Sequence, residues 1–326
     1  MEHGRVGGRY RVERVAGSGG MATVYRATDL TDGRPVAIKR ILDRLRDDPY
    51  ARELFVDEVR VTRALAHPRL VSLRDHGEDT QGPWMALRWV EGLDARRLVA
   101  LRKVPLPTGA VLAMAVDALG ALRSIHGAGV IHRDVAPANV LLGIDGTAWV
   151  ADLGLARSLA HARAEAPGTV KGKIGYLAPE VLRGGLHGVR ADLYGFGAVL
   201  WECLAGRRLF ADVMGQTALA RAFLESPRPL LRTVNPNVPD ALARVVDATL
   251  SLDPDARPPT AAALSDALVR AAQRSGVTPS HDELAVVAWG AATLHPEGPR
   301  SIEARRRSRL SRARTLHDRS GQRAAV

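Results

Sequence analysis

The sequence predicts an α+β fold with two lobes, a small β-rich lobe with one main helix and a larger, mostly helical lobe. Apolar and polar residues alternate over 10–41 and 71–90, which favours strands, whereas helical spacing prevails over 98–268. A chain of 326 residues with 46% hydrophobic residues can build two cores. Aromatic residues make up 4%, so we expect those cores to be mostly aliphatic.

In the first lobe, 10–41 reads as antiparallel strands around a glycine-rich turn. Segment 48–66 has helical spacing, with Leu54, Val61 and Leu65 near one face and Glu58 beside them. Segment 71–90 reads as two further strands joined by a turn at 78–83. The longest apolar stretch, 110–122, is too short for the roughly 20 residues of a membrane span, so we expect a buried helix there.

After about residue 275 a second organisation begins. Ser280 and Glu283 fit a capping box ahead of 284–294, so we expect an accessory helix over 280–295. Residues 296–326 follow as an arginine-rich basic tail, and the part from Gly298 onward contributes about +7 of the net charge of +11. We expect this tail to be solvated and disordered. Nucleic acid, anionic lipid and an acidic partner stay open as its partners, and nucleic acid is disfavoured because no aromatic residue can stack on bases.

The remaining composition limits the class of protein. The single cysteine, Cys203, excludes an intrachain disulfide, and no secretory signal or membrane span is evident, so we expect a soluble, cytoplasmic protein. The oligomeric state is left open. Only four of the 46 basic residues are lysines, so each lysine is less easily treated as incidental.

Two features of the first lobe indicate a phosphate site. Residues 16–24 form a glycine-rich loop between two strands, which lets backbone N–H groups approach phosphate oxygens, although such turns are common. Downstream, Lys39 lies inside an apolar strand, where burial of its charge requires an anion. Nucleotide phosphates can supply that anion, and Glu58 can supply an ion-pair partner. The alternative is a surface lysine on an edge strand.

The segment His132-Arg133-Asp134-Val135-Ala136-Pro137-Ala138-Asn139 carries the strongest signal, and Asp152-Leu153-Gly154 follows it. One carboxylate, Asp134, can orient an attacking hydroxyl and accept its proton. Asp152 and Asn139 offer the hard oxygen ligands that Mg²⁺ prefers. Further on, Ala178-Pro179-Glu180 closes the segment that would hold a protein substrate.

With these motifs the chain resembles the bacterial eukaryotic-like (Hanks-type) serine/threonine protein kinases over roughly 10–270. The resemblance implies a protein-kinase-like fold over 10–272, divided into lobes at about residue 90. It also implies ATP and Mg²⁺ as cofactors and proteins with serine or threonine hydroxyls as substrates. Arg257 would pair with Glu180, and Asp192 would begin the central helix of the large lobe.

The resemblance also assigns the binding residues. Lys39, Glu58, Asp134 and Asn139 are implied to be catalytic, with Asn139 and Asp152 as metal ligands. The implied nucleotide-binding residues are Ala16, Gly17, Ser18, Gly19, Gly20, Met21, Ala22, Thr23 and Val24 of the loop, Lys39, Leu87 behind the adenine pocket, and Trp89 and Val90 of the hinge at 88–90.

The sequence departs from the family at several positions. Ala22 replaces the third glycine of the loop and Leu153 replaces a phenylalanine, and we expect both to be tolerated. Ala136 stands where the family carries a lysine, and Lys173 where it carries a threonine. We hypothesise that Lys173 supplies the missing charge near Asp134 and count it as catalytic. The alternative is that it points to solvent and that catalysis is weakened.

Regulation and specificity leave further alternatives. Autophosphorylation would fall on Thr169 first and Ser158 second, unless the segment is ordered without it. Alanine at 136 also occurs in some tyrosine kinases, but no arginine follows it in the loop, so we favour serine/threonine specificity. Against the active kinase stands a pseudokinase scaffold that binds nucleotide without efficient transfer. A small-molecule kinase is disfavoured because Glu180 and Arg257 belong to the protein-substrate architecture.

Overall fold

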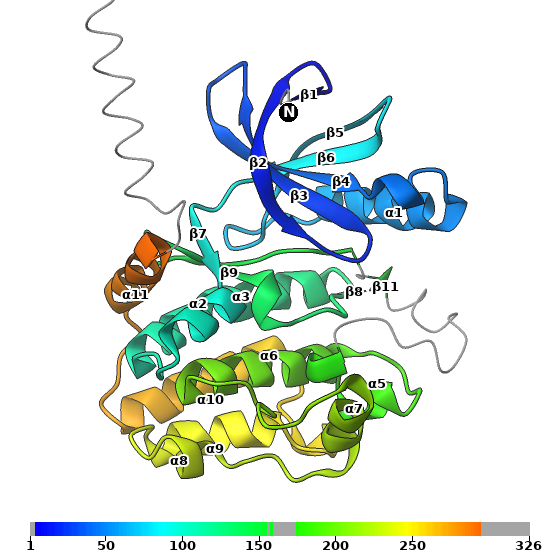
Figure 1. The fold of residues 1–326 in the computed structure, drawn as a ribbon. Coiled ribbons are helices and arrows are strands. Elements are labelled where there is room, and N and C mark those ends of the chain that lie inside the picture. The colour runs from blue at the N-terminus through cyan, green and yellow to red at the C-terminus, as the bar shows by residue number, and fades with distance from the viewer. Residues whose placement is uncertain (1–3, 155–156, 159–173, 295–326) are drawn as a thin grey trace, which may run out of the picture.

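The small lobe is built on one antiparallel sheet. The computed structural model describes residues 4–154, 157–158 and 174–294. The sheet has six strands in the order β1-β2-β3-β4-β6-β5 and caps the molecule in Figure 1. Its strands are β1 (Arg5–Val6), β2 (Tyr10–Ser18), β3 (Ala22–Asp29), β4 (Pro35–Ile41), β5 (Leu73–Asp79) and β6 (Gly82–Arg88). The strands expected over 10–41 and 71–90 are confirmed.

The two faces of this sheet bury different apolar clusters. Val36 and Ile38 of β4 pack with Tyr10 and Trp84 in one cluster. On the other side, Met85 of β6 joins Phe55 and other apolar residues of the neighbouring helix. Because side chains alternate along a strand, Lys39 faces away from Ile38. Lys39 therefore lies on the side of the sheet that the helix covers.

That helix is α1 (Pro49–Ala64), and its sequence explains both of its ends. Asp48 caps it by accepting a hydrogen bond from the Ala51 N–H at 3.0 Å, and Pro49 occupies the first helical position. The chain becomes extended at Leu65, which ends the helix. The buried positions, which include Phe55 and Glu58, lie on the side facing the sheet.

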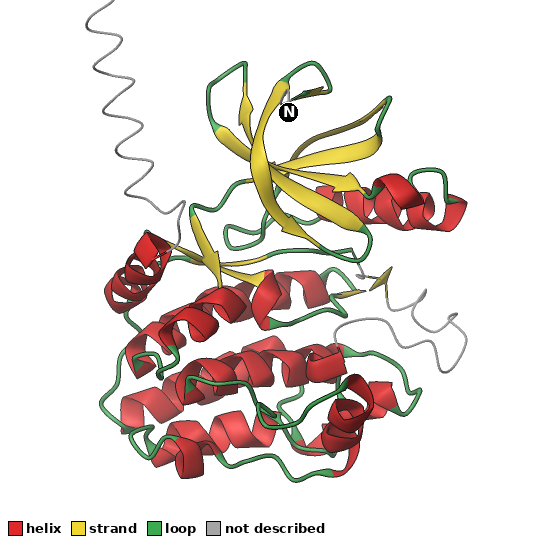
Figure 2. Cartoon of the chain, in the orientation of Figure 1, coloured by secondary structure: helices red, strands yellow, loops and turns green. Residues whose placement is uncertain are grey.

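The large lobe is helical and surrounds α3 (Thr108–Gly127) and α6 (Val189–Ala205), as Figure 2 shows. Both helices are buried along most of their length, and they share one large core with α9, α10 and α11. The other helices are α2 (Ala95–Arg102), α5 (Pro179–Leu182), α7 (Gln216–Glu225), α8 (Leu231–Val234), α9 (Asp240–Thr249), α10 (Ala261–Arg274) and α11 (His281–Leu294). Single 3-10 turns occur at η1 (Asp43–Leu45), η2 (Pro137–Asn139), η3 (Ile174–Tyr176) and η4 (Pro254–Ala256).

Small strands lie where the lobes meet. β7 (Gly92–Asp94), β9 (Val140–Gly143) and β10 (Ala148–Val150) form a sheet in the order β10-β9-β7. β8 (Val130–Ile131) pairs with β11 (Arg157–Ser158). The backbone of Val71 donates to the carbonyl of Val150 at 2.9 Å, so the small lobe is hydrogen-bonded to the strand that precedes Asp152.

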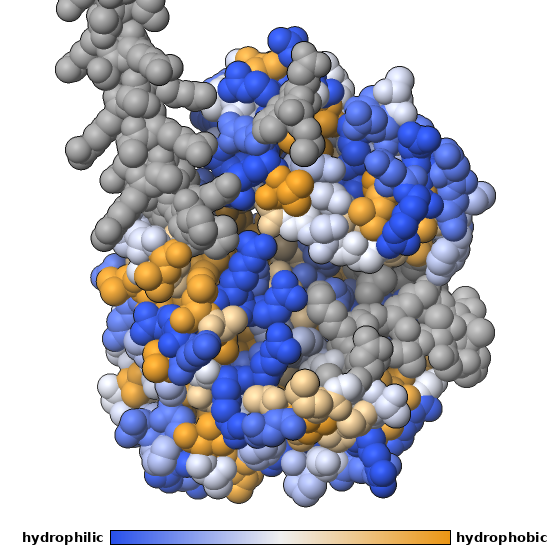
Figure 3. All heavy atoms as spheres, viewed as in Figure 1, coloured by the Kyte–Doolittle hydropathy of each residue, from blue (hydrophilic) through white to orange (hydrophobic). Residues whose placement is uncertain are grey.

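α11 packs on α3, and its start follows part of the expected capping box. The Ser280 hydroxyl accepts from the Glu283 N–H at 3.1 Å, whereas the Ser280 N–H donates to the Gly109 carbonyl at 2.9 Å. Its inner face, which includes Val287, is buried in the large core. Its outer face is apolar too, with Val286 74% and Trp289 38% exposed, and hydrophobic residues gather at this place in Figure 3.

The apolar stretch expected at 110–122 is the middle of α3. Within the described ranges, α3 is long and apolar enough to cross a bilayer. However, 72% of its most apolar window is buried inside the protein. The expectation of a buried core helix is confirmed, because the other core helices cover this segment.

Candidate active site

Lys39 lies between two carboxylates where the two lobes meet. Its Nζ contacts Glu58 Oε1 at 2.6 Å and Asp152 Oδ1 at 2.7 Å. The expected Lys39–Glu58 pair is therefore present, and it joins β4, α1 and the segment after β10. Glu58 is nearly inaccessible, whereas Asp152 is 42% exposed and can reach a ligand there.

The charges of Lys39, Glu58 and Asp152 do not cancel. Burial alone would lower the pKa of Lys39, but Asp152 and Glu58 outweigh that effect and raise it, so the lysine stays charged. Burial raises the pKa of Glu58 to about 7, against the opposing charge of Lys39. Two carboxylates share one ammonium here, so the site is poised to accept further positive charge.

Asp134 and Asn139 meet in the catalytic loop. The Asn139 side-chain amide donates to the Asp134 carbonyl at 2.7 Å and to Asp134 Oδ2 at 2.8 Å. The turn η2, which starts at Pro137, brings the two side chains together over five residues. Because both N–H groups of Asn139 face Asp134, its carbonyl oxygen is the atom left to bind a cation.

Two residues beside the site adopt a backbone conformation that is uncommon outside glycine. Arg133 has φ of 68° and Asp152 has φ of 66°. Among the described non-glycine residues, Lys103 is the one further case of positive φ. Such conformations persist where the surroundings enforce them, and they gather at functional sites.

Asp192 enforces the conformation of the catalytic loop. Its carboxylate accepts from the backbone N–H groups of His132 at 2.8 Å and Arg133 at 2.9 Å. The rings of His126 and His187 contact the same carboxylate at 2.9 and 3.2 Å. Burial would raise the pKa of Asp192, but the hydrogen bonds from the two histidines hold it well below its usual range. The two histidines were missed in the sequence, because their spacing along the chain shows no relation to Asp192.

The glycine-rich loop joins β2 to β3 and leaves room for a ligand. The Gly19 N–H donates to the Ala22 carbonyl at 2.9 Å and closes the turn. A Cβ added at Gly17 or Gly20 would meet no atom within 4 Å. The methyl group of Ala22 is buried in the lobe, so it does not occupy that space. The open loop, together with Lys39, Asp152 and Asn139, fits a nucleoside triphosphate and its cation.

Before the hinge, β6 ends at Arg88, and Leu87 pairs with Ala37 of β4. The Trp89 indole Nε1 donates to Glu91 at 3.0 Å, and the guanidinium groups of Arg14 and Arg26 lie 5.8 and 5.6 Å from its ring centre. Its side chain is thus engaged with charged residues of β2 and β3. The adenine contact that the resemblance implies at this position would accordingly fall to the backbone.

Arg97 of α2 makes a contact between the lobes that the sequence did not reveal. Its Nη2 donates to the Ala16 carbonyl at 3.0 Å, at the start of the glycine-rich loop. Asp94 caps the same helix through the Arg97 N–H at 2.9 Å and also pairs with the Arg97 side chain at 3.3 Å. No sequence pattern links α2 to β2, so this contact depends on how the lobes face each other.

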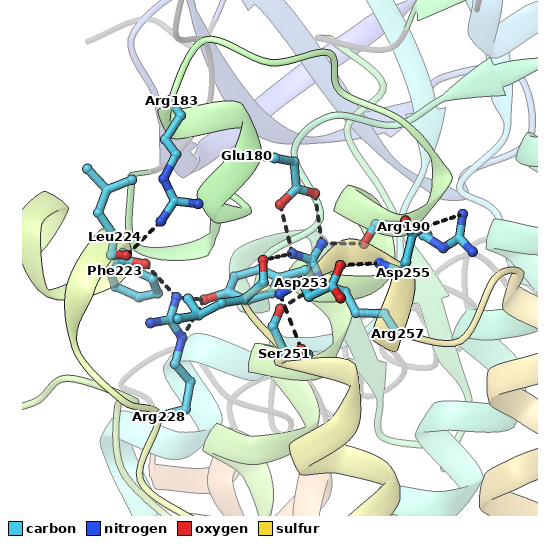
Figure 4. A network of polar contacts seen from close by, with 12 residues as sticks. Glu180, Arg183, Arg190, Phe223, Leu224, Arg228, Ser251, Asp253, Asp255 and Arg257 are labelled. Atoms are coloured by element: carbon cyan, nitrogen blue, oxygen red, sulfur yellow. Dashed lines mark hydrogen bonds and ion pairs between the residues drawn. The ribbon is translucent and has the colours of Figure 1, made fainter.

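The segment after the catalytic loop is anchored by an expected ion pair. Arg257 contacts both carboxylate oxygens of Glu180 at 2.7 Å, as Figure 4 shows. The guanidinium also donates to the backbone carbonyls of Ser251 and Arg190, and it lies against the Tyr194 ring. The side chain of Arg257 is fully buried, so this pair fixes Glu180 to the base of the large lobe.

Tyr176 is fixed from the other side. Its hydroxyl donates to Glu202 at 3.2 Å, and the Leu209 N–H donates to the same carboxylate at 3.1 Å. The Tyr176 carbonyl lies near Gly195, where a Cβ would also meet Val135 beside the catalytic aspartate. Lys173 and Thr169 lie outside the described residues, and Ser158 is described through its backbone in β11.

Comparison with known proteins identifies the class. The protein kinase domain family matches residues 10–269, so the chain belongs to this family. The serine/threonine-protein kinase PknL of Mycobacterium tuberculosis is 34% identical over 256 residues, which are 78% of this chain and 63% of PknL. The DNA damage-responsive serine/threonine-protein kinase RqkA of Deinococcus radiodurans is 36% identical over 299 residues, 90% of this chain and 44% of RqkA.

Solved structures agree with this family. The crystal structure of the Mycobacterium tuberculosis PknI kinase domain has a TM-score of 0.61 and 26% identity, covering 83% of this chain and 98% of that one. The chain spans less than two thirds of the length of PknL and RqkA. The fold is therefore that of a protein kinase, as the sequence predicted.

Proposed function

We propose that this chain is a serine/threonine protein kinase that transfers the γ-phosphate of ATP to hydroxyl groups of proteins. The observation that carries the proposal is the presence of two groups of polar side chains where the lobes meet. Lys39 is held by Glu58 and Asp152, and Asp134 is held by Asn139 in the adjacent loop. The cytoplasm, where ATP is available, is the expected location.

In this proposal each residue has one task. Asp134 orients the acceptor hydroxyl and accepts its proton as the oxygen forms a bond to the γ-phosphorus. The bond from that phosphorus to the bridging oxygen breaks, and ADP leaves. Lys39 holds the α- and β-phosphates, and Glu58 holds Lys39. The backbone of the glycine-rich loop and of the hinge positions the nucleotide.

Mg²⁺ is the cation that this donor set suits. Asp152 and Asn139 offer hard oxygen ligands, and Mg²⁺ commonly binds through one or two protein groups, substrate phosphates and water. The bound ion would neutralise charge on the phosphates. Asp134 is within hydrogen-bonding distance of Asn139, so the same amide can link the metal site to the proton acceptor.

Phosphate incorporation from labelled ATP and Mg²⁺ tests the proposal, with Asp134→Asn as the comparison. Loss of the proton acceptor should lower the rate by about 10²–10⁴-fold while nucleotide binding is retained. Mass spectrometry of the products distinguishes serine and threonine from tyrosine. If nucleotide binds and no protein substrate is labelled by the wild type, the scaffold interpretation replaces the enzyme.

We further propose that Lys173 compensates for Ala136. Ala136 is fully buried beside Asp134, so this side of the loop presents no cation of its own at that position. Lys173 would restore positive charge beside the transferred phosphate. Lys173→Thr should lower the rate, and adding Ala136→Lys should restore it. An unchanged rate in Lys173→Thr alone would contradict this role.

A further inference from the structure

A groove in the small lobe lies between the end of α1 and β5. It has a volume of about 730 Å³. It runs from the last turn of α1 through the connecting loop into β5, elements that lie side by side in Figure 1. Its lining comes from two short stretches, 62–68 and 72–76. None of these residues takes part in the nucleotide site described above.

The charge of the groove is positive. Arg63 and Arg74 line it, are exposed, and have no ion pair or hydrogen bond from their side chains within the described part of the chain. Asp75 is the acidic residue of the lining, and its carboxylate accepts from Tyr10 at 2.8 Å and from Arg9 at 3.3 Å. It is thereby engaged within the lobe, where Arg9 also pairs with Asp29. The groove consequently presents two uncompensated guanidinium groups.

The remaining lining residues determine what kind of anion fits. Leu65 and Leu73 give the groove an apolar component, and His67 is kept neutral because burial, and then Arg69, lower its pKa. A single inorganic ion would leave this apolar surface and most of the volume unused. Single-stranded nucleic acid typically stacks its bases on large aromatic side chains, and the lining contains no phenylalanine, tyrosine or tryptophan. An apolar side chain flanked by carboxylates matches both components.

We propose that this groove is a docking site for an acidic segment of a partner protein, with Arg63 and Arg74 binding carboxylates on either side of an apolar residue. The site is also adjacent to the catalytic machinery. Thr62 lines the groove, and its hydroxyl donates to the backbone carbonyl of Glu58 at 2.7 Å. A bound segment would therefore pack against the turn of α1 that follows Glu58.

The test is direct binding of a fluorescein-labelled peptide of glutamates and leucines to the full chain at physiological ionic strength. The groove variant is Arg63→Glu/Arg74→Glu. The matched control is Arg270→Glu/Arg274→Glu, because these two arginines of α10 are also exposed and also lack partners among the described residues. Both double variants change the net charge equally, so any contribution of the basic tail is the same in both.

We expect the groove variant to bind the peptide at least about tenfold more weakly and the control to change affinity less than about twofold. A peptide with glutamines in place of glutamates should bind neither variant nor wild type. Bound peptide should slow amide hydrogen exchange within 62–76. This binding does not require catalysis, so the Asp134→Asn variant should bind equally well.

Several results would overturn the proposal. Equal weakening by both double variants would show that net charge or the basic tail holds the peptide. Competition by oligothymidine at the same concentration would make the groove a general polyanion site. If light scattering shows a dimer that the groove variant converts to a monomer, a second copy of the chain is the occupant.

Discussion

Arg97 connects the two lobes beside the glycine-rich loop. A solvent-exposed hydrogen bond of this kind contributes about 0.5–1.5 kcal/mol. Because its acceptor is the Ala16 carbonyl, the bond holds β2, which leads into the glycine-rich loop, against α2. Its role is to position the loop, and the chemistry of phosphate transfer does not pass through it.

We predict that Arg97→Ala raises KM for ATP about two- to tenfold and leaves kcat nearly unchanged. The matched control is Arg96→Ala, because Arg96 is a neighbouring exposed arginine whose contact to Asp94 is 4.0 Å long. Steady-state kinetics over a range of ATP concentrations separates the two parameters. Equal effects of the two substitutions, or a fall in kcat alone, would contradict a positioning role.

The single contacts that could be predicted from the sequence are those whose two partners both belong to recognisable motifs. The Lys39–Glu58 and Glu180–Arg257 pairs followed from the sequence because each partner stands in a recognisable motif. The Arg97 bond and the two histidines on Asp192 did not, because they depend on the relative placement of elements far apart in the chain. The groove at 62–76 was hidden for the same reason, since its two arginines carry no local pattern.

At the scale of elements, α1 and α11 were both expected, and the reason differs for each. For α1, the amphipathic spacing and the cap at Asp48 both indicate a helix with one buried face. For α11, the cap was recognised, but the helix is apolar on all sides, so spacing could not reveal which face packs. The structure supplies that information, because Val287 is 3% exposed and Val286 is 74% exposed.

This difference gives a test of whether α11 belongs to the large core. We predict that Val287→Ala lowers the free energy of unfolding by about 2 kcal/mol, from lost apolar burial and the cavity left behind. Val286→Ala removes the same atoms from the exposed face and should change stability by less than about 0.5 kcal/mol. Urea unfolding measures both. If the two variants unfold alike, the helix does not share the cooperative core.

At the scale of the whole molecule, the Glu180–Arg257 pair joins residues 77 positions apart. Removing one partner of a buried pair leaves the other charge without compensation, so we predict that Glu180→Gln lowers the free energy of unfolding by about 3–5 kcal/mol. The exposed pair between Arg221 and Glu225 serves as the comparison. Glu225→Gln should cost no more than about 0.5 kcal/mol. Similar losses in thermal unfolding of the two variants would contradict the anchoring role.

Glu202 makes the stability of the whole molecule depend on pH. Burial raises its pKa to about 7 from an ordinary value of 4.5. Between these values the folded protein holds a proton that the unfolded chain has lost. The contribution of Glu202 is therefore fully present below pH 4.5 and is lost as pH rises through about 7.

Glu202→Gln removes this titration while keeping an oxygen that can accept from Tyr176 and Leu209. We predict that the free energy of unfolding of the wild type, relative to Glu202→Gln, falls by about 3 kcal/mol as pH rises through this range. Urea unfolding at pH 5 and at pH 8 measures the difference. Parallel curves for wild type and Glu202→Gln would mean that Glu202 titrates as it does in water.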